Sequence, residues 1–566
     1  MTENQHVRVH SRCGACGFRF DPGDPFYAFC QGAAPAFGKS DYPNSGYCDN
    51  NHNHPWTFCR IPDCRYCHSS PDSGTVHTHC LKLFLSKFKE GGHPRLQWLW
   101  LAATWRSPWQ GALPLDVEPS VGYRNPNGIL DDLPRMPSLP PELRLKIWEF
   151  CASSPLQLYT AVSDLRDEMA SSKQRKWSSI PLIEIKSWAR SCQLECDDTP
   201  DNPIIRLTFD SRGLRRIERL SKPQSRSSSG SDFNAFVVEA AERFSGVLVE
   251  FQLGLARLQL PTGEANGFHI WDTPCPPPLK RCFSDLSNLP PPCHLGTVQL
   301  RACTGITFFM SSGSTYAVHA HTSNRLSAQS TFEALPTAQR KIVSWVYVPI
   351  EGGITKFGFS QVRKRPGNVT RSQSFLLSTE SAGNIFIGRH RTSFSVIKQP
   401  LTLIHDKPDG LPISFVGAYS EDEGHRLQDT NLSHERSPST AITPSFSSAS
   451  LERASRIQIF YISETAICRG IIIQYEDGLR RALGQCRLGI DPVQEFAMPT
   501  HLCFSNATFR QPRMDEELRG VSVVSTTAKR IHDHKGPCWT CCEMTGFLNF
   551  YFENGATKLE HVIGDK

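Results

Sequence analysis

The residues that could do chemistry are concentrated at the start of the chain. Of 21 cysteines in 566 residues, eight lie within the first 80, accompanied by five histidines from His52 onward. Thiolates and imidazoles are the ligands that zinc prefers in structural sites, where four of them surround the ion as a tetrahedron. Clustered cysteines in a chain without an export signal indicate metal more often than disulfides. The stretch from Cys13 to Cys80 therefore predicts a zinc-binding module.

One ligand set can be proposed from local spacing. Cys13 and Cys16 form a Cys-x2-Cys pair, and neighbouring glycines allow the tight turn that aims both sulfurs at one ion. His77 and Cys80 stand where a helix begins, because apolar residues over 81–88 repeat at the spacing of one helical face. A ligand-bearing turn followed by two ligands at a helix start resembles a treble-clef zinc finger. We predict that Cys13, Cys16, His77 and Cys80 bind one zinc ion.

Cys59, Cys64 and Cys67 form a second, incomplete set of zinc ligands. Spacing does not choose a fourth ligand among five candidates, which are Cys30, Cys48, His52, His54 and His68. The assignment of ligands to the two sites also stays open, because RING-like modules interleave their ligands. Neither set has an obvious open coordination position or general base beside it. The prediction is one or two structural zinc ions.

Two further groups have residue types that bind metals. His319 and His321 alternate along a predicted strand and would face the same side of a sheet, either as a metal pair or, as we favour, as a buried pair. The other group lies near the end of the chain and comprises His532, His534, Cys538, Cys541 and Cys542. The spacing of these residues suits a further zinc site, but no helix or knuckle glycine lies beside them. We therefore favour a loop that leads into the following strand.

A leucine-proline motif follows the cysteine-rich stretch. In SLPPELRLKI, prolines in the first turn and Glu142 near the positive end of the helix dipole predict a helix start. Leu139, Leu143 and Ile147 recur every four residues, as on one apolar face. Leu139, Pro140, Glu142, Leu143 and Ile147 resemble the first helix of an F-box. The resemblance implies docking of these residues to the linker subunit of an SCF-type ubiquitin ligase; the plain alternative is an amphipathic helix.

The order of the motifs along the whole chain also resembles that of a known family. A Cys-rich start, then WLAATWRSPWQ, LPPELRLKIWE and a strand-rich remainder follow one another along the chain. This order resembles a family of filamentous-fungal proteins with a Cys-rich N-terminus and an F-box-like motif. The likeness implies no particular activity.

The second half of the chain is rich in short apolar runs. Runs such as GVLVEFQL, KIVSWVYVPI and GFLNFYF carry β-branched and aromatic residues between turn residues, which favours an all-β sandwich, prism or propeller over βαβ units. The predicted fold class is multidomain α+β, mostly β, with a treble-clef-like module, a short F-box-like helical segment and a large β-rich region that is sandwich- or β-prism-like. The predicted parts are 1–110 (zinc module and following helix), 111–190 (F-box-like helical segment), 191–296 (mixed α/β, with a disordered loop at 221–232), 297–419 (β-rich), 420–450 (disordered linker) and 451–566 (β-rich).

An internal repeat lies within this region. CTGITFFMSSGSTYA (Cys303 to Ala317) aligns without gaps on CRGIIIQYEDGLRRA (Cys468 to Ala482), and each copy reads as strand, glycine turn, strand. The pattern predicts two similar β-hairpins and hence related β-modules, or equivalent elements of one larger β-fold. The residues from Arg456 to Gly478 also resemble a strand pair of jacalin-type β-prism lectins, which implies carbohydrate binding.

Composition restricts the remaining function classes. The net charge of +6 is small for this length, and the basic stretch 212–226 lacks interleaved aromatic residues, so nucleic-acid binding is not expected. Neither an export signal nor an 18-residue apolar run occurs, which predicts an intracellular protein of cytoplasm or nucleus without a membrane partner. The familiar P-loop, nucleophile-elbow and His-Glu-x-x-His motifs are absent.

Three classes of function remain. The favoured one is a non-enzymatic interaction protein, an F-box-like substrate adaptor with a structural zinc module and a β-rich recognition region. The alternative is a carbohydrate- or ligand-binding β-protein in which the zinc module is only a scaffold. The third is an enzyme that uses a zinc or His/Cys site in the β-rich region.

Overall fold

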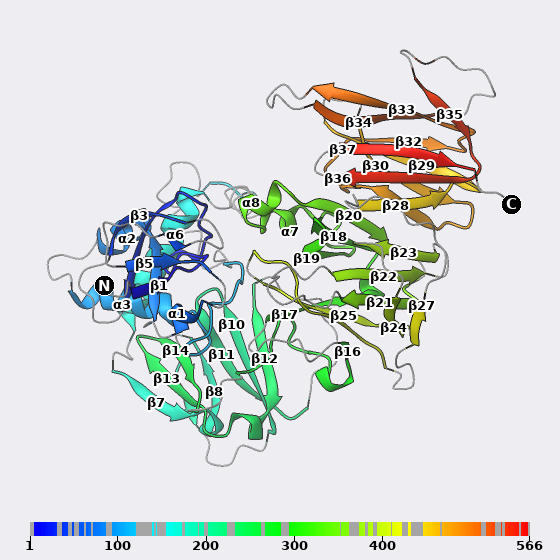
Figure 1. Cartoon of the computed structure of the whole chain (residues 1–566). Helices are drawn as coiled ribbons and strands as arrows, with labels where there is room; N and C mark the ends of the chain where they lie inside the picture. The colour runs from blue at the N-terminus through cyan, green and yellow to red at the C-terminus, as the bar shows by residue number, and fades with distance from the viewer. Residues whose placement is uncertain are drawn as a thin grey trace. The chain divides into compact units, whose positions relative to one another are not determined.

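The chain is mostly β with few helices, as the sequence predicts (Figure 1). The computed structural model describes residues 5–30, 37–43, 48–49, 56–61, 64–68, 72–86, 93–119, 138–140, 143, 154–172, 176–190, 192–196, 202–222, 233–261, 267–284, 294–350, 353–361, 373–379, 383–388, 393–408, 410–421, 428–431, 445–463, 467–510, 517–526, 534, 538–553 and 556–563. Within these ranges, no helix is both long enough and apolar enough to cross a membrane.

The chain divides into two compact units. One comprises Met1–Pro276 with Pro290–Gly296, and the other comprises Pro277–Leu289 with Thr297–Lys566. The six-part division expected from the sequence is finer than this one and stays a prediction.

The first unit begins with two small sheets and three short helices. The sheet order is β1-β5-β4 in one and β3-β2-β6 in the other, and β1 runs parallel to β5. The elements are β1 (Gln5–Arg8), β2 (Pro25–Cys30), β3 (Phe37–Asp41), β4 (Cys48–Asp49), β5 (Trp56–Cys59), α1 (Arg65–His68), β6 (Ser73–His77), α2 (Thr78–Ser86) and α3 (His93–Thr104).

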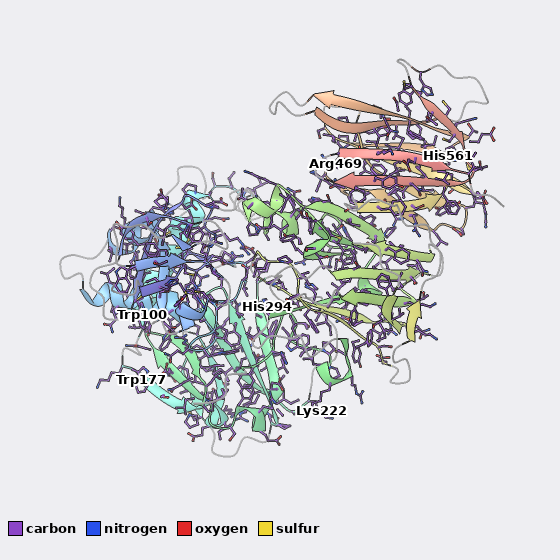
Figure 2. All side chains as sticks on the ribbon, in the orientation of Figure 1. Trp100, Trp177, Lys222, His294, Arg469 and His561 are labelled. Atoms are coloured by element: carbon purple, nitrogen blue, oxygen red, sulfur yellow. The ribbon has the colours of Figure 1, made fainter. Side chains whose placement is uncertain are left out.

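These elements enclose an apolar core that fixes where the ligand-bearing segments lie. Phe26 of β2, Phe84 of α2 and Leu99 of α3 are fully buried in it. Trp100, labelled in Figure 2, donates its indole N–H to the carbonyl oxygen of Asp72 at 3.1 Å and so holds α3 against the start of β6. Gly14 is required at its position, since a Cβ there would lie 2.3 Å from the Cβ of Ala103.

The leucine-proline motif is described only in part. Leu139, Pro140 and Leu143 belong to the described residues, whereas Glu142 and Ile147 lie outside them. The amide of Leu143 donates to the carbonyl oxygen of Pro140 at 3.1 Å, which closes one turn. The side chain of Leu143 is 46% exposed, so the motif presents an apolar group to solvent.

A long helix follows the motif, and then the chain becomes β. α6 (Pro155–Ser171) begins at the N-cap Ser154, whose hydroxyl accepts a hydrogen bond from the amide of Gln157. The helical segment predicted to residue 190 is wrong from Ser178, where β7 (Ser178–Pro181) and β8 (Ile185–Ala189) replace helix. Ile185 and Trp188 explain the change, because both are buried between the sheets that follow.

The rest of the first unit consists of two sheets on one core. One sheet has the order β14-β13-β7, and strands β15-β12-β10-β11-β8-β9 lie side by side in the other. The described residues of 191–296 contain strands and short 3-10 turns but no α-helix, so the mixed α/β prediction is wrong for them. The strands are β9 (Glu195–Cys196), β10 (Ile204–Asp210), β11 (Gly213–Leu220), β12 (Ala235–Ala240), β13 (Leu248–Gln252), β14 (Leu255–Gln259), β15 (Ile270–Trp271) and β17 (His294–Gln299).

The second unit contains two groups of strands, and the first group covers residues 283–431. Two sheets have the orders β19-β18-β20 and β23-β22-β21-β24-β27, strands β16-β26-β25 lie side by side in another sheet, and all three sets of strands contribute to one core. The elements are β16 (Phe283–Ser284), β18 (Gly305–Ser311), β19 (Ser314–His321), α7 (Gln329–Glu333), α8 (Thr337–Arg340), β20 (Ser344–Pro349), β21 (Lys356–Gln361), β22 (Gln373–Thr379), β23 (Gly383–Ile387), β24 (Ser393–Lys398), β25 (Thr402–Asp406), β26 (Val416–Tyr419) and β27 (Gln428–Asn431).

The second group covers residues 445–562 and also has three sheets on one core, drawn yellow to red in Figure 1. Their orders are β28-β36-β37, β31-β30-β29-β32 and β34-β33-β35. The strands are β28 (Ser445–Ser450), β29 (Ala454–Tyr461), β30 (Cys468–Tyr475), β31 (Arg480–Gly484), β32 (Val493–Ala497), β33 (His501–Arg510), β34 (Glu517–Thr526), β35 (Thr540–Glu543), β36 (Phe547–Glu553) and β37 (Ala556–Val562).

Two of these strands correct the predicted disordered linker 420–450. β27 pairs with β24, and β28 pairs with β36 along its whole length. The serine-rich composition of β28 suggested a linker, but its backbone hydrogen bonds to a strand far along the chain stabilise it. The segments 422–427 and 432–444, like the predicted loop from residue 223 to 232, lie outside the described residues.

Both predicted hairpins are confirmed. β18 pairs with β19 through Ser312 and Gly313, both in the left-handed region, and β30 pairs with β31 through a turn containing Gly478. Gly305 and Gly470 hold equivalent places, and a Cβ at either would lie within 2.6 Å of a neighbouring heavy atom. The third strand differs: β20 follows its hairpin along the chain, whereas β29 precedes its own.

Candidate metal centres

The first cluster consists of Cys13, Cys16, His77 and Cys80, the four residues that local spacing predicted. Cys13 and Cys16 lie on a tight turn, in which the amide of Gly17 donates to the carbonyl oxygen of Cys13 at 2.9 Å. Gly17 has φ +85°, a conformation that favours glycine. The turn directs both sulfurs toward the end of β6 and the start of α2.

His77 ends β6, and Cys80 lies in the first turn of α2. The Nδ1 atom of His77 is 3.5 Å from the sulfur of Cys16 and 3.7 Å from that of Cys80. The four ligand atoms all lie within 4.8 Å of one another, and the four residues are at most 5% exposed. The Nε2 atom of His77 faces Asp24 at 3.9 Å, which orients the ring with Nδ1 toward the thiols.

The thiols of the first cluster cannot all ionise without a cation. Burial raises the pKa of Cys16, and hydrogen bonding to Cys13 raises the pKa of Cys80 well above its usual range. The pKa of Cys13 is held well below its usual range, because hydrogen bonds from Cys16 and Cys80 outweigh the effect of burial. One thiolate therefore forms readily. A divalent cation among the four side chains would supply the charge that ionises the other two.

Arginines hold the Cys13 turn in place. Arg12, buried beside it, donates through Nε to Asp116 at 2.6 Å and through Nη2 to Glu118 at 2.8 Å. Arg106 donates to the carbonyl oxygen of Cys13, and burial lowers the pKa of this arginine to about 10. The turn is thus held by Arg106 and by the partners of Arg12, all of which follow α3 in the chain.

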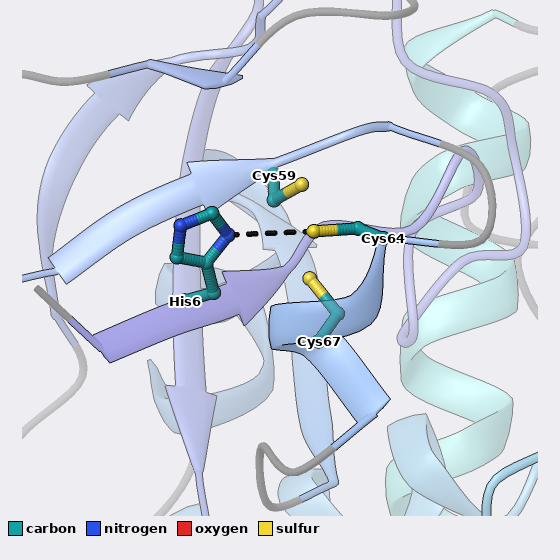
Figure 3. Close-up of side chains that lie close together, drawn as sticks. All are labelled: His6, Cys59, Cys64 and Cys67. Atoms are coloured by element: carbon teal, nitrogen blue, oxygen red, sulfur yellow. Dashed lines mark hydrogen bonds between the residues drawn. The ribbon is translucent and has the colours of Figure 1, made fainter.

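The second cluster consists of His6, Cys59, Cys64 and Cys67 (Figure 3). Cys59 ends β5, Cys64 precedes α1 and Cys67 lies within α1; the amide of Cys67 donates to the carbonyl oxygen of Cys64 at 3.0 Å. The Nδ1 atom of His6 lies 3.6 Å from the sulfur of Cys64. All three thiols are buried, and hydrogen bonding to Cys59 raises the pKa of Cys67 above its usual range. This cluster also has four potential ligands.

His6 is a potential ligand that local spacing does not reveal. It lies in β1, before the stretch from Cys13 to Cys80, and reaches Cys59 only because β1 pairs in parallel with β5. Cys30, a predicted candidate, is not in the cluster; burial raises the pKa of its thiol to about 11. The other four predicted candidates cannot be compared, because the side chains of Cys48 and His68 and the whole of His52 and His54 lie outside the described residues.

The two clusters interleave along the chain. His6 belongs to the second cluster, Cys13 and Cys16 to the first, the next three cysteines to the second, and His77 and Cys80 to the first again. The structure thus sorts the potential ligands into two sets, which spacing along the sequence leaves open. Each set has four ligand atoms, so a tetrahedral ion would find its coordination complete with protein atoms.

The histidine pair of β19 packs as a buried pair. The rings of His319 and His321 face the same side, 4.8 Å apart and edge to face. Both nitrogens of His321 are used, Nδ1 with the carbonyl oxygen of Leu326 at 2.9 Å and Nε2 with the hydroxyl of Thr307 at 2.7 Å. Burial lowers the pKa of His321, so its ring stays neutral. Among the described residues this pair joins no group of potential metal ligands.

A third cluster lies in the second unit and comprises Cys503, His534 and Cys541. Local spacing indicates His534 and Cys541 but not Cys503, which lies opposite Cys541 through strand pairing. Cys538 is exposed and Cys542 is buried in the core; neither belongs to the cluster. His532 lies outside the described residues.

Comparison with known proteins gives no guide to function, so the geometry of the clusters is the basis for assigning one. No protein-family model and no curated protein matches the chain. The clusters are therefore interpreted from the types, distances and burial of their own side chains.

His6 provides a direct test of the second cluster. Replacing it with alanine, H6A, removes one of four ligands, and we expect the metal content of the full chain to fall by about one ion. Elemental analysis after dialysis against a weak chelator measures the change. Cys30→Ser serves as the control, because Cys30 was a candidate ligand but lies outside the cluster, and it should leave the content unchanged. Loss of metal from Cys30→Ser with retention in H6A would contradict the assignment.

Proposed function

We propose that the chain is a non-enzymatic interaction protein whose N-terminal zinc module is structural and whose β-rich regions recognise a partner. The observation that carries the structural role of the zinc module is the closure of both N-terminal clusters. Each offers four ligands, and seven of these eight side chains are buried. A catalytic zinc needs an open position for water or substrate, and a complete tetrahedron of protein ligands provides none.

The chemistry of the ligands supports zinc as the ion. Each cluster combines three thiols with one imidazole, a Cys3His set typical of structural zinc sites. The first cluster also fits a treble-clef arrangement, with a ligand-bearing turn at Cys13–Cys16 and the remaining ligands around the start of α2. One ion in each cluster gives two structural zinc ions.

The partner contact that we propose for the N-terminal half is the F-box-like motif. Leu143 follows a proline-started turn and exposes 46% of its side chain, which suits a docking residue better than a core residue. With Leu139, Pro140, Glu142 and Ile147 it would bind the linker subunit of an SCF-type ubiquitin ligase. The β-rich regions would then hold the substrate. An adaptor of this kind works in the cytoplasm or nucleus.

A second candidate function rests on the sheets of residues 445–562. Three sheets of three or four strands surround one core, which fits a β-prism better than a two-layer sandwich. β29 and β30 supply the antiparallel strand pair that the jacalin-like pattern requires.

In this alternative, the second unit binds a carbohydrate and the zinc module is only a scaffold. A glycan array probed with the full chain should show at least one specific ligand if this alternative is correct, and a blank array would exclude the glycans displayed.

Metal removal tests the structural role of the zinc module. Structural zinc contributes about 10–16 kcal/mol of apparent binding free energy in small zinc-finger peptides, comparable to the whole stability of a domain. Removing the metal with a strong chelator should therefore unfold the segment that contains β1 to α3. Hydrogen exchange measured by mass spectrometry would show lost protection there. The hairpin β30–β31 has no ligand of any cluster and serves as the internal control. Full protection of the N-terminal segment in metal-free protein would refute the structural role.

The adaptor role is tested by co-purification. Leu143→Ala combined with Ile147→Ala should weaken binding of a ligase linker subunit at least about tenfold, because truncating a central apolar contact typically costs more than 1 kcal/mol. Tyr159→Ala is the matched control, since Tyr159 is exposed on α6 but lies outside the motif. Quantitative mass spectrometry of the captured proteins gives the readout. If no linker subunit is captured, or if the double variant captures as much as the unchanged chain, the adaptor role fails.

A further inference from the structure

The third cluster is built on a strand pair at one edge of the sheet β34-β33-β35. Cys503 of β33 stands directly opposite Cys541 of β35. Neighbours along each strand face the other way, because side chains alternate across a sheet. Leu502, Phe504 and Cys542 accordingly lie in the core of the group, which leaves Cys503 and Cys541 on the opposite face. Strand register therefore holds two thiols side by side outside that core.

A histidine completes the cluster from outside the sheet. The Nε2 atom of His534 lies 3.2 Å from the sulfur of Cys541, and the three ligand atoms all lie within 4.8 Å of one another. The ring of Trp539 stacks on His534 with centroids 4.4 Å apart and an interplanar angle of 13°. This stacking fixes the plane of the imidazole while Nε2 points at the sulfur. Trp539 and Cys541 are two positions apart, so one short segment supplies both a ligand and the support for another.

We propose that Cys503, His534 and Cys541 form a third zinc site, in which the described residues supply three ligands and leave the fourth coordination position to water or to a small exogenous ligand. Two thiolates and one imidazole suit zinc, and three protein ligands with one free position are characteristic of zinc that remains accessible. Among the described residues no other side chain contributes a ligand atom to this cluster. Cys503 is buried, but Cys541 is exposed and His534 is half-buried, whereas every thiol of the first two clusters is buried.

The open position predicts different exchange behaviour from that of the closed N-terminal clusters. A chelator can bind directly to an ion with a free, solvent-facing position, whereas an ion with four protein ligands must first lose one of them. The third site should therefore release its zinc to a chromogenic chelator in a faster phase than the first two clusters. The inference does not depend on the adaptor or the lectin proposal, because it concerns only side chains of the second unit.

Zinc content of the full, untagged chain under reducing conditions tests the proposal. Cys503→Ser and His534→Ala should each lower the content by about one ion per chain and remove the fast phase of release. His534→Ala leaves the sheet core untouched, so it tests the site even if Cys503→Ser fails to fold. Cys538→Ser is the matched control: Cys538 has the predicted Cys-x2-Cys spacing to Cys541 but lies outside the cluster, and its replacement should leave zinc content and kinetics unchanged.

Either of two zinc measurements would overturn the third site. One is wild-type zinc content and an unchanged fast phase in both Cys503→Ser and His534→Ala. The other is loss of zinc from Cys538→Ser without loss from Cys503→Ser. That result would show that Cys538, and not Cys503, binds the ion with Cys541. A disulfide between Cys503 and Cys541 in reduced, zinc-supplied protein, detected by mass spectrometry, would also contradict the proposal.

Discussion

The N-terminal part of the chain depends on bringing buried thiols together where like charges would repel one another. Cys13, Cys16 and Cys80 lie with His77 in a core that excludes water, and Cys13 alone ionises readily without a cation. A metal ion bound by these side chains would couple metal binding to folding in this region, as it does in small zinc modules.

The surrounding residues extend this constraint into the neighbouring β-structure of the first unit. Arg106 donates a hydrogen bond to the carbonyl oxygen of Cys13. The adjacent Trp105 packs against the β10–β11 turn, where a Cβ added to Gly213 would lie 2.2 Å from the carbonyl oxygen of Trp105. Arg257 of β14 is buried and binds both Asp72, beside β6, and the carbonyl oxygen of Trp109. Loss of the first cluster would therefore loosen the contacts between the zinc module and the sheets behind it.

Local patterns in the sequence were sufficient wherever the interacting residues are close along the chain. Cys13 and Cys16 share one turn, His77 and Cys80 one helix start, and both hairpins have their glycine turns where predicted. Sequence reasoning failed where strand pairing joins distant segments. Parallel pairing of β1 with β5 supplies His6, antiparallel pairing supplies Cys503, and β28 forms despite its serines because β36 completes its hydrogen bonds. Local spacing carries no information on such pairings.

Burial and the number of ligands indicate different roles for an ion in each of the three clusters. The first two have four ligands each and hold segments that are distant in the sequence, so a bound ion would serve the fold. The third offers three potential ligands among the described residues: Cys503 is buried on the central strand β33 of its sheet, His534 is half-buried, and Cys541 is exposed on the edge strand β35. An ion there would add little to the stability of that sheet, and its open position would make it responsive to zinc supply and to small ligands. A zinc-dependent effect on recognition would therefore arise in the second unit, whereas the N-terminal ions would stay bound throughout.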